Sequence, residues 1–210
     1  MKKIVGILFS VLIMSSCKGQ TDSPSNKLIG GPCEDCEAAL DYTILDITPT
    51  PTLTITGFNQ TEPKIKITGR VLQPDDKTPA GNIILYVYQT NRKGIYEPSE
   101  NPVGRENRHG KYRGWMKTDA DGSFEFYTFR PASYPNRSEP EHIHLYIKEP
   151  DKNPYYVDSY LFDDDPLLTQ GVRASLNNRG GSGVIKLEHK NGILTAHRDI
   201  ILGLNIPDYY

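Results

Sequence analysis

The sequence predicts an all-β fold, either a sandwich or a barrel of short strands. Many short segments alternate apolar and polar residues with a period of two, which is typical of strands with one buried face. Turn-forming residues separate these segments, and the 210 residues include 16 prolines and 18 glycines. No long segment carries apolar residues at helical spacing. Together these patterns favour many strands joined by turns and loops.

The clearest strand is expected at 64–72, where Ile65, Ile67 and Val71 alternate with polar residues. Turn residues follow at 75–81, and residues 82–89 are rich in the β-branched and aromatic types that favour strands. A strong turn signal at 119–122 precedes a third strand segment. The remaining strands are expected at 123–129, 143–147, 155–162, 183–187 and 197–202.

The N-terminus has the pattern of an export signal. Lys2 and Lys3 precede an apolar run at 4–14, which is shorter than the roughly 20 residues needed to span a bilayer. Cys17 follows two serines, as in bacterial lipoprotein signals. We expect residues 1–16 to be a signal peptide and Cys17 to be lipidated. The protein would then be exported and anchored to a bacterial envelope membrane, on its periplasmic or cell-surface face. The alternative is an ordinary signal peptide with a chance cysteine.

Composition limits the kind of partner that the mature chain can bind. Without Lys2 and Lys3, 22 basic residues stand against 26 acidic ones, a formal charge of −4. Such a chain lacks the concentrated basic face that binds nucleic acid. The 194 residues after the signal suit one domain. We expect a tether at 17–28, an irregular arm at 29–63 with at most one short helix near Ala38, and the β domain at 64–210.

Cys33 and Cys36 lie close together in the arm. Outside the cytoplasm a structural disulfide is the favoured state of such a pair, with free thiols as the alternative. A redox motif would lie between a strand and a helix, and a zinc site would need further ligands nearby. Neither context is present in the sequence around the pair.

Two histidines indicate a metal site. If His142 and His144 lie on a strand, they project from the same face and can share one ion. A His-x-His pair is by itself often only the polar face of a strand. Two tyrosines, Tyr96 and Tyr134, lie upstream of this pair. Phenolate and imidazole together suit a hard ferric ion, and a phenol with a pKa of about 10 ionises when a cation binds it.

The order of these motifs resembles that of the intradiol ring-cleavage dioxygenases, which include catechol and protocatechuate dioxygenases. The resemblance covers about Lys64 to Leu202, and four elements carry it: Gln89-Thr90-Asn91 leading to Tyr96, Thr118-Asp119-Ala120-Asp121-Gly122, Pro131 to Tyr134, and His142 to His144. It implies a β-sandwich of mixed and antiparallel strands, with long loops that carry the metal site.

The resemblance also implies a chemistry. Fe(III) would be held by Tyr96, Tyr134, His142 and His144, and O₂ would open a catechol ring between its two hydroxyl-bearing carbons. Tyr134 would be the tyrosine that substrate displaces and that takes a proton, whereas Tyr96 would stay bound. Tyr112 is the competing candidate for the position of Tyr96. The implied partners are a small aromatic substrate and O₂, with the lipid anchor as the only membrane contact, and a homo-oligomer is left open.

Two positions depart from the family pattern. The family has an arginine three residues before the first histidine, where this chain has Glu139. Arg137 is the nearest arginine that could take its place. The family also has a glutamine near the substrate, where this chain has Ser159. Such changes around a metal site commonly cost roughly 10- to 100-fold, so we expect an altered substrate, a lower rate or lost cleavage.

Two other functions therefore compete with catechol cleavage. One is a degenerate dioxygenase that binds iron and catechol without opening the ring. The other is a surface module, because residues 69–124 also resemble the carboxypeptidase-regulatory-like sandwiches of bacterial surface proteins. Those modules lack the set of two tyrosines and two histidines, which is the feature that separates the two classes.

Overall fold

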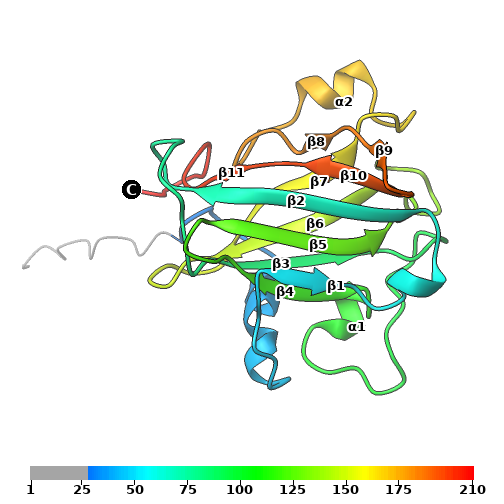
Figure 1. The fold of residues 1–210 in the computed structure, drawn as a ribbon, viewed down its shortest axis with the longest axis horizontal. Coiled ribbons are helices and arrows are strands. Elements are labelled where there is room, and N and C mark those ends of the chain that lie inside the picture. Colours follow the sequence, from blue (N-terminus) through cyan, green and yellow to red (C-terminus); the bar gives the residue numbers. More distant parts are fainter. Residues whose placement is uncertain (1–27) are drawn as a thin grey trace, which may run out of the picture.

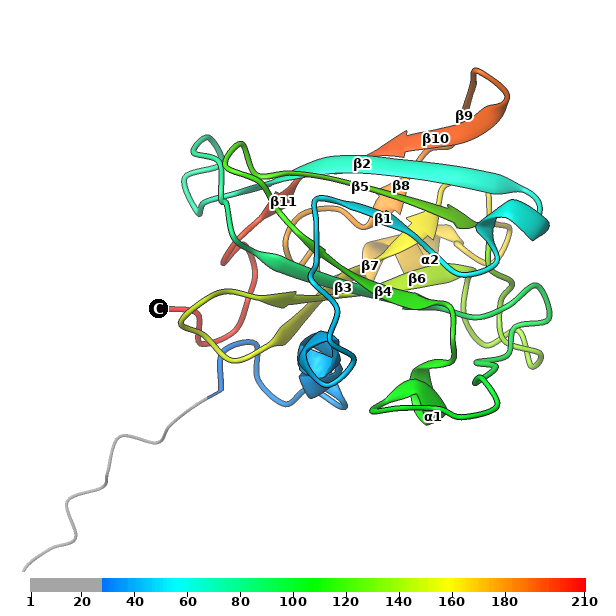
Figure 2. The ribbon, with the colours of Figure 1, turned by 60° about the horizontal axis from the view of Figure 1, so that its bottom comes forward.

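The computed structural model describes residues 28–210, which form a sandwich of two β-sheets (Figures 1 and 2). The first is a six-stranded sheet, in the order β1 (Thr52–Thr54), β5 (Ser123–Phe129), β2 (Lys64–Leu72), β10 (Ile193–His197) and β9 (Glu188–Lys190), with β11 (Ile200–Ile201) also paired to β2. The second is a five-stranded sheet, in the order β4 (Arg113–Lys117), β3 (Ile84–Gln89), β6 (His142–Lys148), β7 (Tyr155–Phe162) and β8 (Val184–Ile185).

Strand directions are mixed in both sheets. The pairs β1–β5, β2–β10, β2–β11 and β7–β8 are parallel. The pairs β2–β5, β3–β4, β3–β6, β6–β7 and β9–β10 are antiparallel. The predicted all-β sandwich of mixed and antiparallel strands is therefore confirmed.

The main hydrophobic core fills the space between the sheets. Ile65 and Ile67 on β2 and Phe126 on β5 meet Leu85 and Leu145 from the opposite sheet, and all five are at most 1% exposed. The alternation on β2 puts its other residues on the outer face, where they are half-buried or exposed. This core packs against the inner face of the five-stranded sheet, and the site lies on the other face of that sheet.

A second apolar cluster covers the outer face of the five-stranded sheet. Tyr86, Tyr88, Trp115 and Tyr146 pack there beneath the 3₁₀ helix η1 (Cys36–Thr43). The indole of Trp115 donates a hydrogen bond of 3.0 Å to the carbonyl of Ala38 in that helix. All six residues of β3 are consequently buried, because both faces of this sheet are covered.

Several expected strands were placed well, whereas the C-terminal one was wrong. Strands at 64–72, 123–129 and 155–162 have the predicted bounds. The single strand expected at 197–202 is instead divided between β10 and β11. Arg198 interrupts it, because its buried side chain turns toward β7 and donates to the carbonyl of Asp158 at 2.6 Å. Strands β4 and β9 were not predicted.

The arm at 29–63 is more regular than expected. Besides η1 it contains β1 and the 3₁₀ helix η2 (Phe58–Gln60), so the expectation of at most one short helix is wrong. Strand β1 runs parallel to β5 in the six-stranded sheet. Its Leu53 packs over Gly114, where a Cβ would lie 2.7 Å from Leu53 Cδ1. The sandwich therefore begins before residue 64.

The remaining helices are short: α1 (Glu106–His109) and α2 (Gln170–Ala174). Within residues 28–210, no helix has the length and apolar character needed to cross a membrane. The expected signal peptide, Cys17 and most of the tether lie outside the described residues.

Candidate metal centre

His142 and His144 occupy neighbouring positions on the outer face of β6. The intervening Ile143 points into the main core and is 1% exposed. The two Nε2 atoms lie 3.0 Å apart, and the rings are perpendicular. The strand period thus brings both imidazoles to one point, as the sequence predicted.

Contacts at the other nitrogen of each ring orient both histidines. His142 Nδ1 lies 2.7 Å from the carbonyl of Pro140, an acceptor that requires a proton on Nδ1. His144 Nδ1 lies 3.4 Å from the hydroxyl of Ser159 on β7. A ring whose Nδ1–H is held by an acceptor keeps a free lone pair on Nε2, the usual arrangement of metal-binding histidines.

The two tyrosines come from loops that meet at Gly94. The side chain of Asn91 accepts hydrogen bonds from the backbone N–H groups of Lys93 and Ile95, which folds the chain back before Tyr96. Gly94 has φ +75°, and a Cβ there would lie 2.1 Å from the carbonyl oxygen of Ser133. Only glycine fits this approach, and it places the loop of Tyr96 directly against the residue before Tyr134.

Four donor atoms converge at the ends of these side chains. We call Tyr96, Tyr134, His142 and His144 the tyrosine–histidine cluster. Tyr96 Oη lies 2.8 Å from Tyr134 Oη and 2.8 Å from His144 Nε2. Tyr134 Oη lies 3.2 Å from His142 Nε2, and the two imidazole nitrogens close the ring at 3.0 Å.

These separations fit a single metal ion. Donor atoms bound at about 2 Å to one ion lie about 3 Å from one another. Between residues 28 and 210, no group of three or more His, Cys, Asp and Glu side chains could hold a metal. A metal site here therefore depends on the phenols, and a set of two phenols and two imidazoles suits a hard ferric ion.

Burial controls protonation within the tyrosine–histidine cluster. Burial and the hydrogen bond with Tyr134 raise the pKa of Tyr96. Burial also raises the pKa of Tyr134, although its hydrogen bond with Tyr96 opposes this. For His144, burial holds the pKa well below its usual value, so the imidazole is neutral. A bound cation would reverse the balance for the phenols, because its field favours phenolate.

Tyr112 lies away from the cluster. Its ring packs edge-on against Phe129, and its hydroxyl lies 3.4 Å from a carboxylate oxygen of Glu97. The geometry therefore selects Tyr96, rather than Tyr112, as the partner of Tyr134.

A cavity of about 520 Å³ opens beside the cluster and is lined by His142 and His144. A smaller hollow of about 280 Å³ is lined by Tyr96, Tyr134 and His144. A cavity of the larger size accommodates a substituted aromatic ring.

Of the residues expected near a substrate, two line the larger cavity and one does not. Glu139 and Ser159 line it, and Glu139 Oε2 lies 4.0 Å from His142 Nε2. Arg137 is exposed and lines a separate hollow with Arg130 and Glu141. The expectation that Arg137 replaces the missing arginine is therefore wrong, because the turn after Tyr134 directs it to another side of the loop.

The sequence missed Asp158 as a cavity residue. Strand β7 shifts register against β6, so that Asp158 and Ser159 together oppose His144. Such a bulge can turn a side chain toward an active site, and both residues line the cavity. The local sequence gives no signal for this bulge.

The stacking of Tyr88 was also missed. Its ring lies between His144, at 4.3 Å between centroids, and His109, at 3.8 Å. The alternation of 82–89 could have shown that Tyr88 shares a face with Tyr86, but not which histidines would meet it. Tyr88 pairs with His144 across β3 and β6, so the stack holds His144 from the β3 side.

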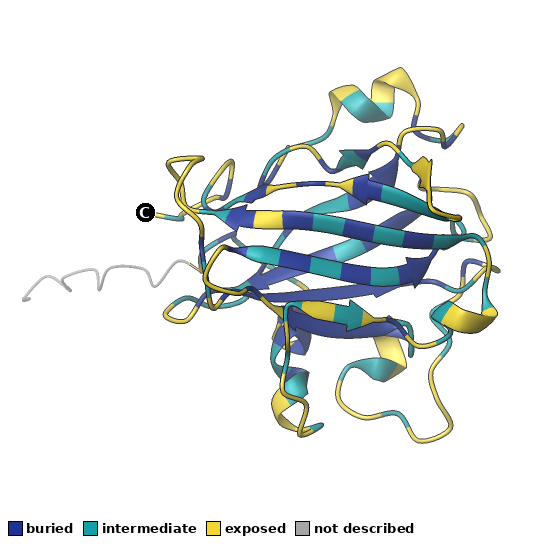
Figure 3. Cartoon of the chain, viewed as in Figure 1, coloured by how far each residue is buried: buried dark blue, intermediate teal, exposed yellow. Residues whose placement is uncertain are grey.

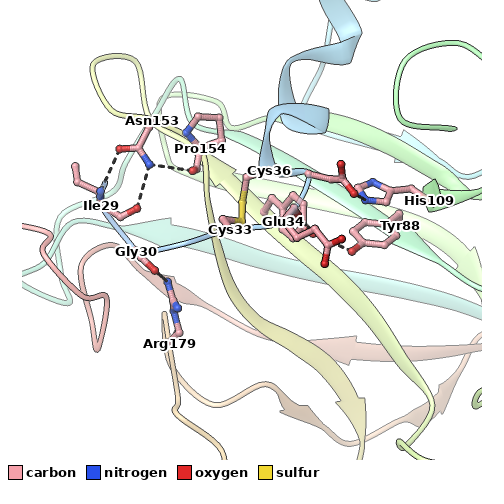
Figure 4. The surroundings of a disulfide bond; sticks show 12 residues. Ile29, Gly30, Cys33, Glu34, Cys36, Tyr88, His109, Asn153, Pro154 and Arg179 are labelled. Carbon is pink, nitrogen blue, oxygen red and sulfur yellow. Dashed lines mark hydrogen bonds and ion pairs between the residues drawn. A yellow bond between two sulfur atoms is a disulfide. The ribbon is translucent and has the colours of Figure 1, made fainter. Parts of the chain in front are cut away.

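The arm passes beside Tyr88 and His109 at its disulfide (Figure 4). Cys33 and Cys36 form a disulfide, and Glu34 between them lines both the cavity and the smaller hollow. The arm is held to the domain by Gly30, whose carbonyl accepts a hydrogen bond from Arg179 at 3.0 Å, and by Ile29, which pairs with Asn153.

Comparisons with known proteins identify the family of the chain. A family model described as Dioxygenase matches residues 44–191, which are 148 of the 210 residues and begin inside the arm. The protocatechuate 3,4-dioxygenase beta chain of Burkholderia cepacia is 33% identical over 117 residues, covering 50% of this chain and 47% of that protein. Catechol 1,2-dioxygenase 1 of Acinetobacter lwoffii is 28% identical over 118 residues, covering 49% and 37%. The matched segments thus span less than half the length of these curated relatives.

Solved structures show the same fold. The dioxygenase domain of a dioxygenase–carbohydrate-binding fusion from Streptomyces sp. SirexAA-E superposes with a TM-score of 0.55 at 21% identity, covering 73% of this chain and 87% of that one. A 3-chlorocatechol 1,2-dioxygenase from Rhodococcus opacus 1CP gives 0.56 at 16% identity, covering 84% and 71%. With the matched segment, the sandwich and the order of its motifs in agreement, the chain belongs to the intradiol ring-cleavage dioxygenase family.

Proposed function

We propose that this protein is a non-haem Fe(III) dioxygenase that opens a catechol ring between its two hydroxyl-bearing carbons with O₂. The observation that carries the proposal is the convergence of two phenol oxygens and two imidazole nitrogens, 2.8–3.2 Å apart, beside a cavity of ring size. Membership of a ring-cleaving family supports the reaction class.

The tyrosine–histidine cluster would hold the iron. Fe(III) held there would supply the Lewis acidity that makes a catechol ring reactive toward O₂. Pro140 and Ser159 contribute by holding the Nδ1 sides of the two imidazoles, so that both Nε2 atoms face the ion.

Tyr134 is suited to accept a substrate proton. It precedes the exposed segment 135–139, whereas Tyr96 packs near Tyr88 and has its backbone against Gly110. Tyr134 can therefore move away from the cluster with less loss of packing. Its phenolate oxygen would take the proton of a catechol hydroxyl as the substrate enters.

Apolar side chains limit water in the cavity. Leu161 from β7, the cross-strand neighbour of His142, lines it together with Val172 and Leu176 from the α2 region. A less aqueous cavity strengthens the electrostatic interactions of the reacting groups and limits side reactions with water.

The test is to purify protein lacking residues 1–20 after loading with iron in air. We expect a visible absorption band from tyrosinate-to-iron charge transfer, one iron per chain, and a shift of the band when catechol is added. With ¹⁸O₂, the ring-opened product should carry both labelled atoms. A colourless, iron-free protein would contradict the metal site.

A second candidate function is binding of iron and catechol without cleavage. The Glu139 carboxylate near the cluster favours it, because no Lys or Arg among the described residues lines the larger cavity. A charge-transfer band that shifts with catechol, without uptake of O₂, would select this function.

We further propose that the protein is exported and lipid-anchored at Cys17. The support is the sequence pattern alone, a basic start and a short apolar run before Ser15-Ser16-Cys17. One acyl chain binds a membrane only marginally, so stable anchoring needs more than one. Cys17→Ser should move the protein from the membrane to the soluble fraction, and unchanged fractionation would contradict the proposal.

A further inference from the structure

The larger cavity presents carboxylates from three separate parts of the chain. Glu139 precedes β6, Asp158 is turned inward by the bulge in β7, and Glu34 belongs to the arm. The sequence signal concerned only the first of these. The bulge and the arm bring the other two to the same surface.

Two of these carboxylates are without a close ion pair to Lys or Arg in the described part of the chain, although the buried Arg198 interacts electrostatically with Asp158. The side chain of Asp158 accepts a hydrogen bond of 2.8 Å from the backbone N–H of Asn178, and that of Glu139 is 59% exposed and faces His142. Neither forms an ion pair with Lys or Arg among residues 28–210. Glu34 is different, because it pairs with Arg108.

The arginines close to the cavity form ion pairs or hydrogen bonds with other parts of the chain. Arg108 lines only the smaller hollow, where it also pairs with Asp35. Arg179 and Arg198 are buried behind the cavity wall and donate to the backbone carbonyls of Gly30 and Asp158. A carboxylate on a ligand in the cavity would therefore meet carboxylates and find no guanidinium or ammonium group to pair with.

The rest of the wall suits a ligand with a short chain and a positive end. Tyr146 lines the cavity, and an aromatic face attracts cations. Tyr156 also lines it, with one face of its ring already covered by the guanidinium of Arg179. Leu145 and Val157 line the same cavity and offer apolar contact for methylene groups.

We propose that the cavity selects catechols whose ring substituent ends in an ammonium group, with Glu139 and Asp158 as the residues that determine the preference. The inference rests on the proposed function, because it supposes that the catechol oxygens bind at the tyrosine–histidine cluster. Neutral substituents are tolerated, and carboxylated catechols are disfavoured.

The test uses three catechols that share a two-carbon linker at ring position 4. The linker ends in an ammonium group in 4-(2-aminoethyl)catechol, in a methyl group in 4-propylcatechol, and in a carboxylate in 3-(3,4-dihydroxyphenyl)propanoate. Dissociation constants are measured on the iron-loaded protein without O₂, by calorimetry and by the shift of the visible band. We expect the ammonium compound to bind at least about tenfold tighter than the carboxylate, a difference of about 1.4 kcal/mol, with the neutral compound between them.

Substitutions test whether Glu139 and Asp158 determine the preference for the ammonium compound over the carboxylate. Glu139→Gln and Asp158→Asn should each reduce the ratio of the two dissociation constants, and Glu139→Lys should invert it. The control is Glu188→Gln on β9, an exposed position on the other sheet, which should leave the ratio unchanged. A carboxylate that binds as tightly as the ammonium compound to unaltered protein would overturn the inference while leaving catechol binding intact. If none of the three binds, the proposed function itself fails, and this inference with it.

Discussion

The two sheets of the sandwich differ in how their outer faces are used. In the six-stranded sheet, the residues on the outer face of β2 are half-buried or exposed. Buried and less buried residues therefore alternate along this strand (Figure 3). Strand β3 in the five-stranded sheet is buried throughout, because η1 of the arm and the aromatic cluster cover its outer face. The tyrosine–histidine cluster lies at the edge of this covered face.

This difference shows how a small domain can build a metal and substrate site on one face of a sheet. The main core between the sheets is formed by residues of both of them. The covered outer face brings the buried His142, the aromatic cluster and a cavity together. Changes on this face should therefore affect metal binding and substrate binding, whereas changes on the open face should affect neither.

Loss of a cluster residue should have the largest effect. His144→Ala removes one imidazole donor and the ring that stacks on Tyr88. We expect iron affinity to fall by more than about 100-fold, since even residues that only support a metal ligand cost 10- to 100-fold. Iron content after dialysis and the visible band provide the measurement. Tyr112→Phe is the matched control and should keep both, because Tyr112 lies away from the cluster.

His109 should make the stability of the covered face depend on pH. Burial, followed by the charges of Arg113 and Arg108, lowers its pKa from 6.5 to about 4. Between these values the unfolded chain binds a proton that the folded chain does not. Stability is therefore lost as pH falls from about 6.5 to 4, by up to about 3 kcal/mol.

Urea unfolding at pH 7 and pH 4.5 tests this expectation. The difference in unfolding free energy between the two pH values should shrink in His109→Phe. It should persist in His197→Gln, whose imidazole is 63% exposed on the open sheet. An equal pH dependence in unaltered protein and His109→Phe would rule out this role of His109.

Loss of the disulfide should change the unfolding free energy by less than the titration of His109 does. Closing the short Cys33–Cys36 loop limits the unfolded chain and stabilises the folded one by about 2 kcal/mol in the chain-entropy view. Cys33→Ser combined with Cys36→Ser should lower the unfolding free energy by about that amount. It should also weaken catechol binding a few-fold, because Glu34 would no longer be held at the cavity. Unchanged binding would mean that the arm stabilises the sheet without shaping the cavity.

Glu139 should have the smallest effect of the four. Like charges about 4 Å apart cost roughly 4 kcal/mol at an effective dielectric of 20, but this side chain is 59% exposed and is therefore screened. We expect Glu139→Arg to speed cleavage of unsubstituted catechol by about tenfold, or 1.4 kcal/mol in activation free energy. Stopped-flow measurement of O₂ uptake would detect it. Equal rates would mean that the carboxylate turns away from bound catechol.

Local patterns in the sequence determined much of the sandwich. Strand β2 could be bounded from its alternation, because a strand with one buried face must repeat every two residues. The same period placed His142 and His144 on one face. The resemblance named Tyr96 and Tyr134 as their partners, with Tyr112 still competing for the place of Tyr96.

Tertiary structure alone decided the surroundings of those ligands. It excluded Tyr112 and Arg137, brought Glu34 from the arm to the cavity, and used a bulge to turn Asp158 inward. It also joined the short β1 to the six-stranded sheet, although three residues are too few to show a period. Each of these outcomes depends on contacts between segments that are distant in sequence. Such contacts leave no local periodicity, so they follow from the packing of the whole domain.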